Sequence, residues 1–292
     1  MAVNKKIGKV SQGANDFLKP YAPTIGTATD VGTGRAYNDG AATVTFTATG
    51  PNAATSYTVT AVEDATKTAS GASSPITVTG LASGTNYTFK VAGTNGYGTG
   101  DQSSASNQIT ATTVPQAPTI GSATNVPSGR GYNDGRVDVA FTAGATGGKS
   151  ITGYTALSSG SQTGTGSTSP ITVTGLASAT NYTFQVKATN ANGDSAYSSA
   201  SGAATVTTVP QTPSAPSATS PSAGTDTVSW TAPNNGGSGI TNYYWASSDG
   251  KTGNTTATSV NVTQEQGTAQ TYTVRADNAN GSSGTSAASN SV

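Results

Sequence analysis

The sequence predicts an all-β chain of three tandem β-sandwiches, each with about seven strands, preceded by a short extended N-terminal arm. Two observations point to this class: a long segment occurs twice in succession with a diverged third copy, and apolar residues in each copy alternate with polar ones. Alternation at a period of two is typical of strands with one buried face. The composition agrees, because Thr, Ser, Gly and Val dominate while the chain has only four Leu and one Met.

The repeat defines the domain organisation. Tyr37 returns as Tyr132 and Phe89 as Phe184 at a constant offset of 95 residues, which is the size of a whole domain rather than of a solenoid turn. The predicted segments are an arm at 1–20 and three domains at 21–115, 116–210 and 211–292.

Short strands separated by tight turns fill each repeat. Val44-Thr-Phe46 and Tyr182-Thr-Phe184-Gln-Val186 place an apolar side chain at every second position. Asn-Gly and Asp-Gly pairs between such stretches, as at Asn192-Gly193 and Asp249-Gly250, are strong signals for turns between strands. Several short strands with this spacing favour a two-sheet sandwich.

Charge is distributed unevenly although the formal net charge of the chain is zero. The arm carries four Lys against one Asp, whereas the three repeats come to −2, +1 and −2. We expect the basic arm to dock on an acidic protein surface, and the alternative is a solvated leader kept in solution by its lysines. The expected docking residues are Lys5, Lys6, Ile7, Lys9, Val10, Phe17, Leu18 and Lys19. Lysines without interleaved aromatic residues do not indicate nucleic acid as a partner.

The residue inventory argues against catalysis and cofactors. The chain has no Cys and no His, so a thiol nucleophile, a zinc–thiolate site and the commonest general base are missing. The carboxylates Asp39, Asp134, Glu63 and Glu265 are scattered rather than paired as in glycoside hydrolases. The first 20 residues contain no apolar stretch of a secretory signal, and no apolar run reaches membrane length. We therefore expect no enzyme, no cofactor, no metal, no secretory signal and no membrane insertion.

Specific motifs give a family resemblance. The segment from Val228-Ser-Trp230 through Pro233-Asn-Asn-Gly-Gly to Tyr243 resembles the second and third strands of fibronectin type III domains. Gly80-Leu81-Ala-Ser-Gly-Thr-Asn-Tyr87 and its counterpart ending at Tyr182 are similar to the corner that precedes strand F in that family. The resemblance implies three fibronectin type III-like sandwiches in which Tyr87 and Tyr182 bond to the backbone through their hydroxyls.

The sequence departs from the family pattern in two places. Alignment puts Gln270 where the third repeat should have its corner tyrosine, and Tyr272 where Phe184 sits, so we expect that corner to be missing. An extra Arg-x-Tyr-Asn-Asp-Gly segment, at 35–40 and 130–135, is absent from the third repeat. We expect a structural turn in which Arg35 or Arg130 pairs with Asp39 or Asp134. Calcium is the alternative, although two acids per loop fall short of its usual ligand number.

The resemblance also suggests a setting. A tandem array with a basic arm, no enzyme domain, no Cys and no export signal is similar to the fibronectin-type and other Ig-like proteins of tailed-bacteriophage particles. That similarity implies a non-enzymatic structural protein, such as a decoration, neck or tail appendage, docked through its arm on a capsid, neck or tail protein. It would lie on the virion surface after assembly in the host cytoplasm and release by lysis.

A second class of function stays open. Fibronectin type III modules also serve as cell-surface or glycan-binding adhesins, and exposed aromatic rings are the usual contacts for sugars. The candidate contacts for host-surface glycans are Tyr37, Tyr132 and Tyr244. Tyr244 alternates with Tyr243 and Trp245, so it faces solvent if those two face the core. A tyrosine beside Asn-Asp-Gly more often packs over a turn than holds a ligand.

Overall fold

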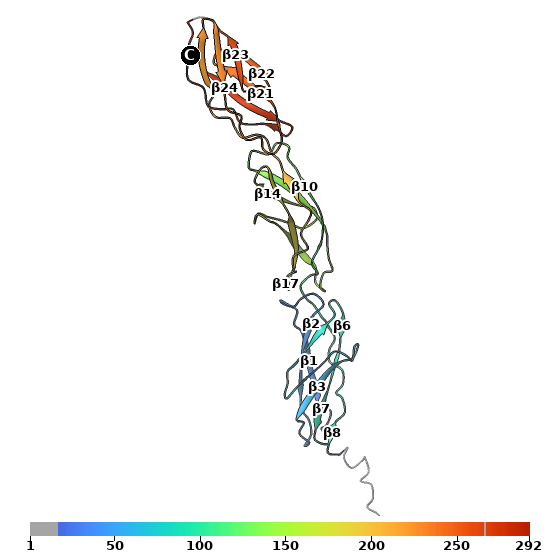
Figure 1. Ribbon diagram of the computed structural model, residues 1–292. Helices are drawn as coiled ribbons and strands as arrows, with labels where there is room; N and C mark the ends of the chain where they lie inside the picture. Colours follow the sequence, from blue (N-terminus) through green and yellow to red (C-terminus); the bar gives the residue numbers. More distant parts are fainter. Residues whose placement is uncertain (1–16, 266) are drawn as a thin grey trace, which may run out of the picture. The chain divides into compact units, whose positions relative to one another are not determined.

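The computed structural model describes residues 17–265 and 267–292, and all regular elements in that part of the chain are strands (Figure 1). The predicted all-β class is therefore confirmed. The expected docking residues Lys5, Lys6, Ile7, Lys9 and Val10 lie outside the described residues. The chain divides into two compact units. The first unit comprises Met1–Ala117, Ala143–Thr152 and Ala188–Ala196, and the second comprises Pro118–Thr142, Gly153–Lys187 and Tyr197–Val292.

The first unit contains the first sandwich and loops from one end of the second sandwich. The two main sheets of the first sandwich have the strand orders β1-β2-β5 and β4-β3-β7-β8, and a short pair β6-β9 accompanies them. Its strands are β1 (Thr24–Asp30), β2 (Gly40–Thr47), β3 (Ser56–Ala61), β4 (Thr68–Gly71), β5 (Ile76–Leu81), β6 (Asn86–Tyr87), β7 (Phe89–Asn95), β8 (Gly98–Thr99) and β9 (Ile109–Thr110).

The second sandwich repeats this plan at the expected offset. Its sheets have the orders β10-β11-β14 and β13-β12-β16-β17, with the short pair β15-β18. Its strands are β10 (Thr119–Asn125), β11 (Gly135–Thr142), β12 (Ile151–Ser158), β13 (Thr163–Gly166), β14 (Ile171–Leu176), β15 (Thr180–Tyr182), β16 (Phe184–Asn190), β17 (Gly193–Asp194) and β18 (Ala204–Val206).

The third sandwich, in the second unit, keeps the two main sheets. They have the orders β19-β20-β23 and β22-β21-β24-β25. Its strands are β19 (Ser217–Ser222), β20 (Thr225–Ser229), β21 (Ile240–Ser247), β22 (Thr252–Thr255), β23 (Ser259–Thr263), β24 (Tyr272–Asn278) and β25 (Gly281–Ser282).

Period-two burial produces the cores. Val44, Val59 and Val91 of the first sandwich are fully buried, and in β5 the buried Ile76 and Val78 alternate with exposed threonines. One aromatic pair recurs at the same place in all three cores: Phe46–Tyr57, Phe141–Tyr154 and Trp230–Tyr243, with ring centroids 4.8, 4.7 and 5.5 Å apart. Such tilted pairs add to the stability that burial supplies.

The tyrosine corners are present where the motifs predict them. The hydroxyl of Tyr87 accepts a hydrogen bond from the backbone N–H of Ala82 at 3.1 Å, and Tyr182 does the same with Ala177. In the third sandwich this corner is missing as expected, because Gln270 takes the position and is buried there. The corner prediction is thus confirmed for the first two repeats.

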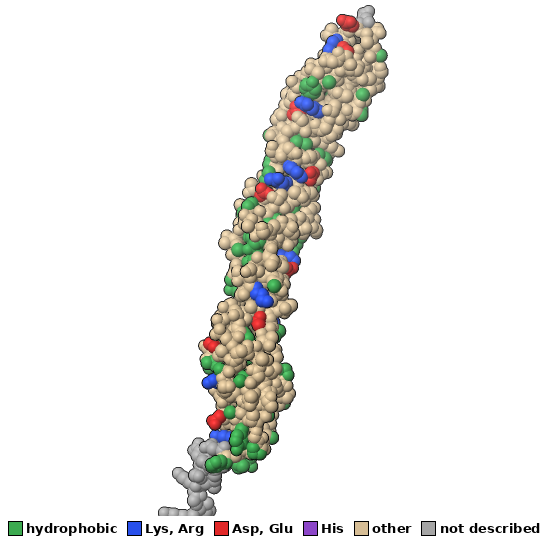
Figure 2. All heavy atoms as spheres, turned by 180° about the vertical axis from the view of Figure 1, so that it is seen from behind, with side chains coloured by type: hydrophobic (Ala, Val, Ile, Leu, Met, Phe, Trp, Pro, Cys, Tyr) green, Lys and Arg blue, Asp and Glu red, His purple; other side chains and the backbone are tan. Residues whose placement is uncertain are grey.

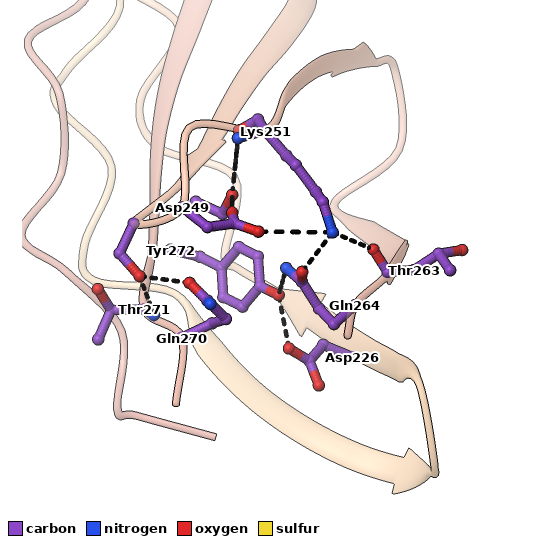
Figure 3. A network of polar contacts seen from close by, with 10 residues as sticks. Asp226, Asp249, Lys251, Thr263, Gln264, Gln270, Thr271 and Tyr272 are labelled. Carbon is purple, nitrogen blue, oxygen red and sulfur yellow. Dashed lines mark hydrogen bonds and ion pairs between the residues drawn. The ribbon is translucent and has the colours of Figure 1, made fainter. Parts of the chain in front are cut away.

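A polar cluster replaces part of the third core (Figure 3). Strand pairing places Asp226 opposite Val262 as Val137 lies opposite Val173, so a carboxylate occupies a position that is apolar in the second sandwich. Tyr272, fully buried, donates its hydroxyl to Asp226 at 2.6 Å and accepts from the Gln264 side chain at 2.6 Å. Burial, followed by the hydrogen bond to Asp226, raises the pKa of Tyr272 to about 12.

In each sandwich, the segment directly after β8, β17 or β25 pairs through serines rather than through a regular ladder. In the second sandwich the backbone N–H of Ser198 donates to the Val186 carbonyl at 2.9 Å, and its hydroxyl oxygen accepts from the Val186 N–H at 3.0 Å. The other serines that do this are the half-buried Ser106 and the buried Ser103, Ser195, Ser201, Ser283, Ser286 and Ser289. An edge paired in this irregular way discourages addition of a further strand.

Candidate docking sites at the sandwich poles

The Arg-x-Tyr-Asn-Asp-Gly segments form pinned turns, as predicted. Arg35 pairs with the Asp39 carboxylate at 2.8 Å and donates from its Nε to the Asp39 carbonyl. Arg130 and Asp134 repeat the pair at 2.5 Å. Asn38, with a φ of 65°, exchanges two hydrogen bonds with Ser83, which holds the turn on the pole of the sandwich where the chain leaves. We call this end of a sandwich its C-terminal pole.

Within the first unit, this turn contacts the loops at the entry end of the second sandwich, its N-terminal pole. The Gly34 N–H donates to the Asn192 carbonyl at 2.9 Å, and the Val114 N–H donates to the Arg35 carbonyl at 3.0 Å. The buried Asn190 side chain donates to the Thr113 carbonyl at 2.9 Å. The segments are therefore one half of a polar joint, and the asparagines after β16 are the other half.

The second unit contains the same joint with the same residue types. The Val209 N–H donates to the Arg130 carbonyl at 3.1 Å, and the Gly129 N–H donates to the Asn280 carbonyl at 3.3 Å. The Asn278 side chain donates to the Thr208 carbonyl at 2.9 Å, as Asn190 does to Thr113. The third repeat lacks the segment itself and contributes Asn278 and Asn280 to this joint.

Paired glycines at the N-terminal pole leave space for the backbone of the linker. Gly147 has a φ of +72°, and a Cβ there would lie 2.4 Å from the Val114 carbonyl oxygen. Gly236 has a φ of +69° and meets the Val209 carbonyl oxygen at 2.5 Å. Both the left-handed backbone and the close approach require glycine here. The Gly-Gly pairs are the third component of the joint.

The first sandwich uses its own N-terminal pole to hold residues 17–20. The Asn95 side chain donates to the Leu18 carbonyl at 2.8 Å, and Leu18 stands 95 positions before Thr113. Asn52, which replaces the first glycine of the Gly-Gly pair, donates to the carbonyls of Phe17 and Lys19 at 2.7 and 3.0 Å. The end of the arm thus occupies the position that a linker occupies in the other two sandwiches.

The side chains around this pole differ from those of the joints. Tyr97 takes the position of Asn192 and is 56% exposed, whereas Asn192 is 4% exposed. Phe17, Leu18 and Tyr21 are exposed as well, at 84%, 42% and 55%. Figure 2 shows hydrophobic side chains gathered at this end of the first sandwich beside the residues drawn in grey. Of the predicted docking residues, Phe17, Leu18 and Lys19 therefore lie at one pole.

Each of the three candidate sugar contacts has different surroundings. Tyr37 is half-buried beside the first joint, in a groove of about 410 Å³ that Val114 and Pro115 also line. Tyr132 lines the corresponding groove of about 570 Å³ beside the second joint. Tyr244 is half-buried with the Arg275 guanidinium 4.6 Å from its ring centre, a cation–π contact. Tyr243 is buried and Trp245 packs on the core, so Tyr244 points to the opposite face of its sheet.

Other chemistry finds little support among residues 17–265 and 267–292. They contain no cluster of three metal-ligating side chains and no helix of the length and apolarity that a membrane crossing requires. Glu63 accepts two hydrogen bonds from Thr88, which lower its pKa although partial desolvation, the largest single influence, opposes them. This carboxylate stabilises the chain at Thr88 through hydrogen bonds, which is a structural role.

The joint asparagines and the serine ladder were not predicted from the sequence. Their signals are visible in the printed sequence: Asn190-Ala-Asn192-Gly193 recurs as Asn278-Ala-Asn280-Gly281, and serines recur at every third position after each. In the ladder, a serine hydroxyl accepts the hydrogen bond from a strand N–H that a carbonyl of a neighbouring strand would otherwise accept.

Comparison with known proteins agrees with this architecture. The family model for the fibronectin type III domain matches residues 31–109 and 124–203. Chitinase A1 of Niallia circulans is 38% identical over 136 residues, and the match covers 42% of this chain and 18% of that protein. The crystal structure of chicken CNTN1 FN1-FN3 domains aligns over 94% of this chain and 97% of its own, at 17% identity and a TM-score of 0.34. Titin kinase with its flanking domains aligns over 29% and 17%, at 27% identity and a TM-score of 0.27. The chain belongs to the fibronectin type III family.

Proposed function

We propose that this protein is a non-catalytic structural component of a tailed-phage virion, attached through its N-terminal arm and presenting tandem fibronectin type III sandwiches. The receiving partner is a capsid, neck or tail protein, and the chain acts as a decoration or appendage on the virion surface. Assembly takes place in the host cytoplasm, and release occurs by lysis. The sandwiches supply spacing and presentation rather than chemistry.

The hydrogen bonds between the first sandwich and the end of the arm are the main support for this proposal. Asn95 and Asn52 bind the backbone carbonyls of Phe17, Leu18 and Lys19, and all three bonds are at most 3.0 Å long. Because the backbone is bound, the side chains of Phe17 and Leu18 are left exposed for a partner. A partner that binds these side chains is thereby coupled to the sandwich through hydrogen bonds and not through a loose tether alone.

The tightness of this contact gives further support. Gly100 stands where the second sandwich has Ser195, and a Cβ at Gly100 would lie 1.9 Å from the Pro20 carbonyl oxygen. Any side chain here would displace the chain at Pro20. The first sandwich thus has Gly100 in place of the first serine of the ladder, which leaves room for the end of the arm.

Co-sedimentation with purified phage particles from the same source tests the proposal. We expect the full chain to sediment with particles and a form lacking residues 1–20 to remain in the supernatant. A matched control carries K5E, K6E and K9E, which reverse the charge of the arm without shortening it. It should bind weakly, and added salt should raise its residual binding while lowering that of the wild type, because salt screens repulsion as well as attraction. Failure of the full chain to sediment would contradict the virion setting.

Polysaccharide adhesion is a second candidate, favoured by the identity with part of Chitinase A1. The name of that relative indicates action on chitin, and its matching segment would be a non-catalytic module. In this reading Tyr37, Tyr132 and Tyr244 contact sugar. Binding to chitin or to glycan arrays should then survive removal of residues 1–20 and fall on replacement of these tyrosines by Ala, whereas arm-mediated docking predicts the reverse.

A further inference from the structure

We infer that the N-terminal pole of the first sandwich is a built docking face for an apolar protein segment flanked by acidic residues. The face, called the entry face below, consists of Phe17, Leu18, Tyr21 and Tyr97. It extends the proposed arm site onto the folded domain, and it rests on the proposed function only in taking the arm as the attached end.

The entry face is continuous with the arm contacts already described. The Tyr97 N–H donates to the Asn95 side-chain oxygen at 2.9 Å, and the same Asn95 amide binds Leu18. Tyr21 packs over Gly50, whose added Cβ would lie 2.5 Å from the Tyr21 ring. Both tyrosines are therefore held by the scaffold on the pole from which the arm departs.

The corresponding pole is an interface in both other sandwiches. In the first unit it receives residues 112–116, and in the second unit it receives residues 207–211, through hydrogen bonds from Asn190 and Asn278. Those two poles are lined by amides and glycines that match backbone carbonyls. The first sandwich keeps the asparagine that binds the incoming chain. At the position where the second sandwich has Asn192, whose buried side-chain amide donates a further hydrogen bond to the Thr112 hydroxyl, the first sandwich has Tyr97.

The substitution of aromatic for amide indicates the chemistry of the occupant. Four of the seven large apolar side chains that are exposed in the described chain lie at this one pole. A concentration of exposed apolar residues marks an interaction site rather than ordinary surface. Tyrosine and phenylalanine are enriched at the centres of such interfaces.

The positive charge of the arm indicates which residues should surround the apolar centre of the partner segment. The arm has a net charge of +3, and Lys19 lies between Leu18 and Pro20 beside the entry face. A second copy of this chain would bring like charges together across the contact, which disfavours self-association. An acidic rim around an apolar centre complements both features.

The test uses the full chain, labelled with ¹⁵N, and a defined 18-residue peptide with leucines on one helical face and glutamates on both sides of it. We expect amide shifts confined to residues 17–21 and 95–98. Tyr97→Asn, which installs the joint residue, should weaken binding at least tenfold. Tyr197→Asn removes another exposed aromatic residue and should leave affinity unchanged.

Several results would overturn the inference. Shifts that map elsewhere, no binding at millimolar peptide, or equal affinity of the Tyr97→Asn variant would each show that the face is not a docking site of this kind. A dimer in analytical ultracentrifugation that Tyr97→Asn dissolves would identify a second copy as the occupant instead. Peptide binding at the face together with failed co-sedimentation would remove the virion setting while leaving the face in place.

Discussion

The polar cluster in the third core offers the sharpest energetic test. Asp226 and Tyr272 occupy positions that are Val137 and Phe184 in the second sandwich, where both are fully buried. Tyr272→Phe removes one of the two hydroxyl donors to the Asp226 carboxylate, and the other comes from the exposed Ser220. Leaving a buried polar group short of a partner costs about 1–3 kcal/mol. Asp226→Val leaves the Tyr272 hydroxyl without its acceptor and should cost a similar amount.

The double variant should recover most of this loss. Replacing both partners by apolar residues of similar shape recreates the pair found in the second sandwich, and such exchanges are often nearly neutral. With two single effects of about 1–3 kcal/mol each and a nearly neutral double variant, the coupling energy of the cycle is about 2–6 kcal/mol in magnitude. If the two single effects simply add, the two side chains do not depend on each other and the reasoning is refuted.

Tryptophan fluorescence isolates this sandwich in the intact chain. Both tryptophans of the sequence, Trp230 and Trp245, lie in the third sandwich. For a domain of this size the urea m-value is about 1 kcal/mol/M, so each single variant should lower the midpoint by about 1–3 M. The double variant should unfold near the wild-type midpoint.

Three further outcomes follow from the structure. The pKa of Tyr272 is raised from about 10 to about 12, so its contribution to stability is complete below pH 10 and is lost as the pH rises toward 12. The urea midpoint of the wild type should therefore fall between pH 10 and pH 12, and that of Tyr272→Phe should fall less. Ser198→Ala leaves the Val186 N–H without an acceptor and should destabilise the second sandwich by about 1–3 kcal/mol in thermal unfolding, whereas the exposed Ser199→Ala should change nothing measurable. Gly147→Ala should speed amide exchange at Thr113, because the added Cβ would clash with the linker. Gly175→Ala is the control, since Gly175 has the same positive φ with open space around it. Equal exchange at Thr113 in both variants would show that backbone strain, and not the clash, causes the effect.

Much of the fold was predictable because period-two burial acts locally. The alternation around Val44 and Phe46 predicts the buried face of β2, and the corner motif predicts the hydroxyl contact of Tyr87. The loss of the third corner was also readable, since Gln270 cannot make that contact. These features depend on neighbours in sequence or on a recurring family motif.

The joints were not predictable because their partners are distant in sequence. Arg35 and Asp39 could be paired from their spacing, but the contact of Gly34 with Asn192 spans two domains and no local pattern indicates it. The role of Tyr97 at the entry face likewise emerges only when the three poles are compared position by position. The burial of Asp226 was not predicted either, because its strand position becomes clear only from the pairing of β20 with β23.

Photocrosslinking on assembled particles tests whether the N-terminal end of the chain is the attached end. A benzophenone amino acid is placed at position 17, 97 or 222 of the full chain, and particles are purified and irradiated. Attachment through the N-terminal end predicts crosslinks from positions 17 and 97 to one and the same particle protein, and none from position 222 in the third sandwich. Crosslinks only from position 222, or no incorporation into particles at all, would contradict attachment through the N-terminal end.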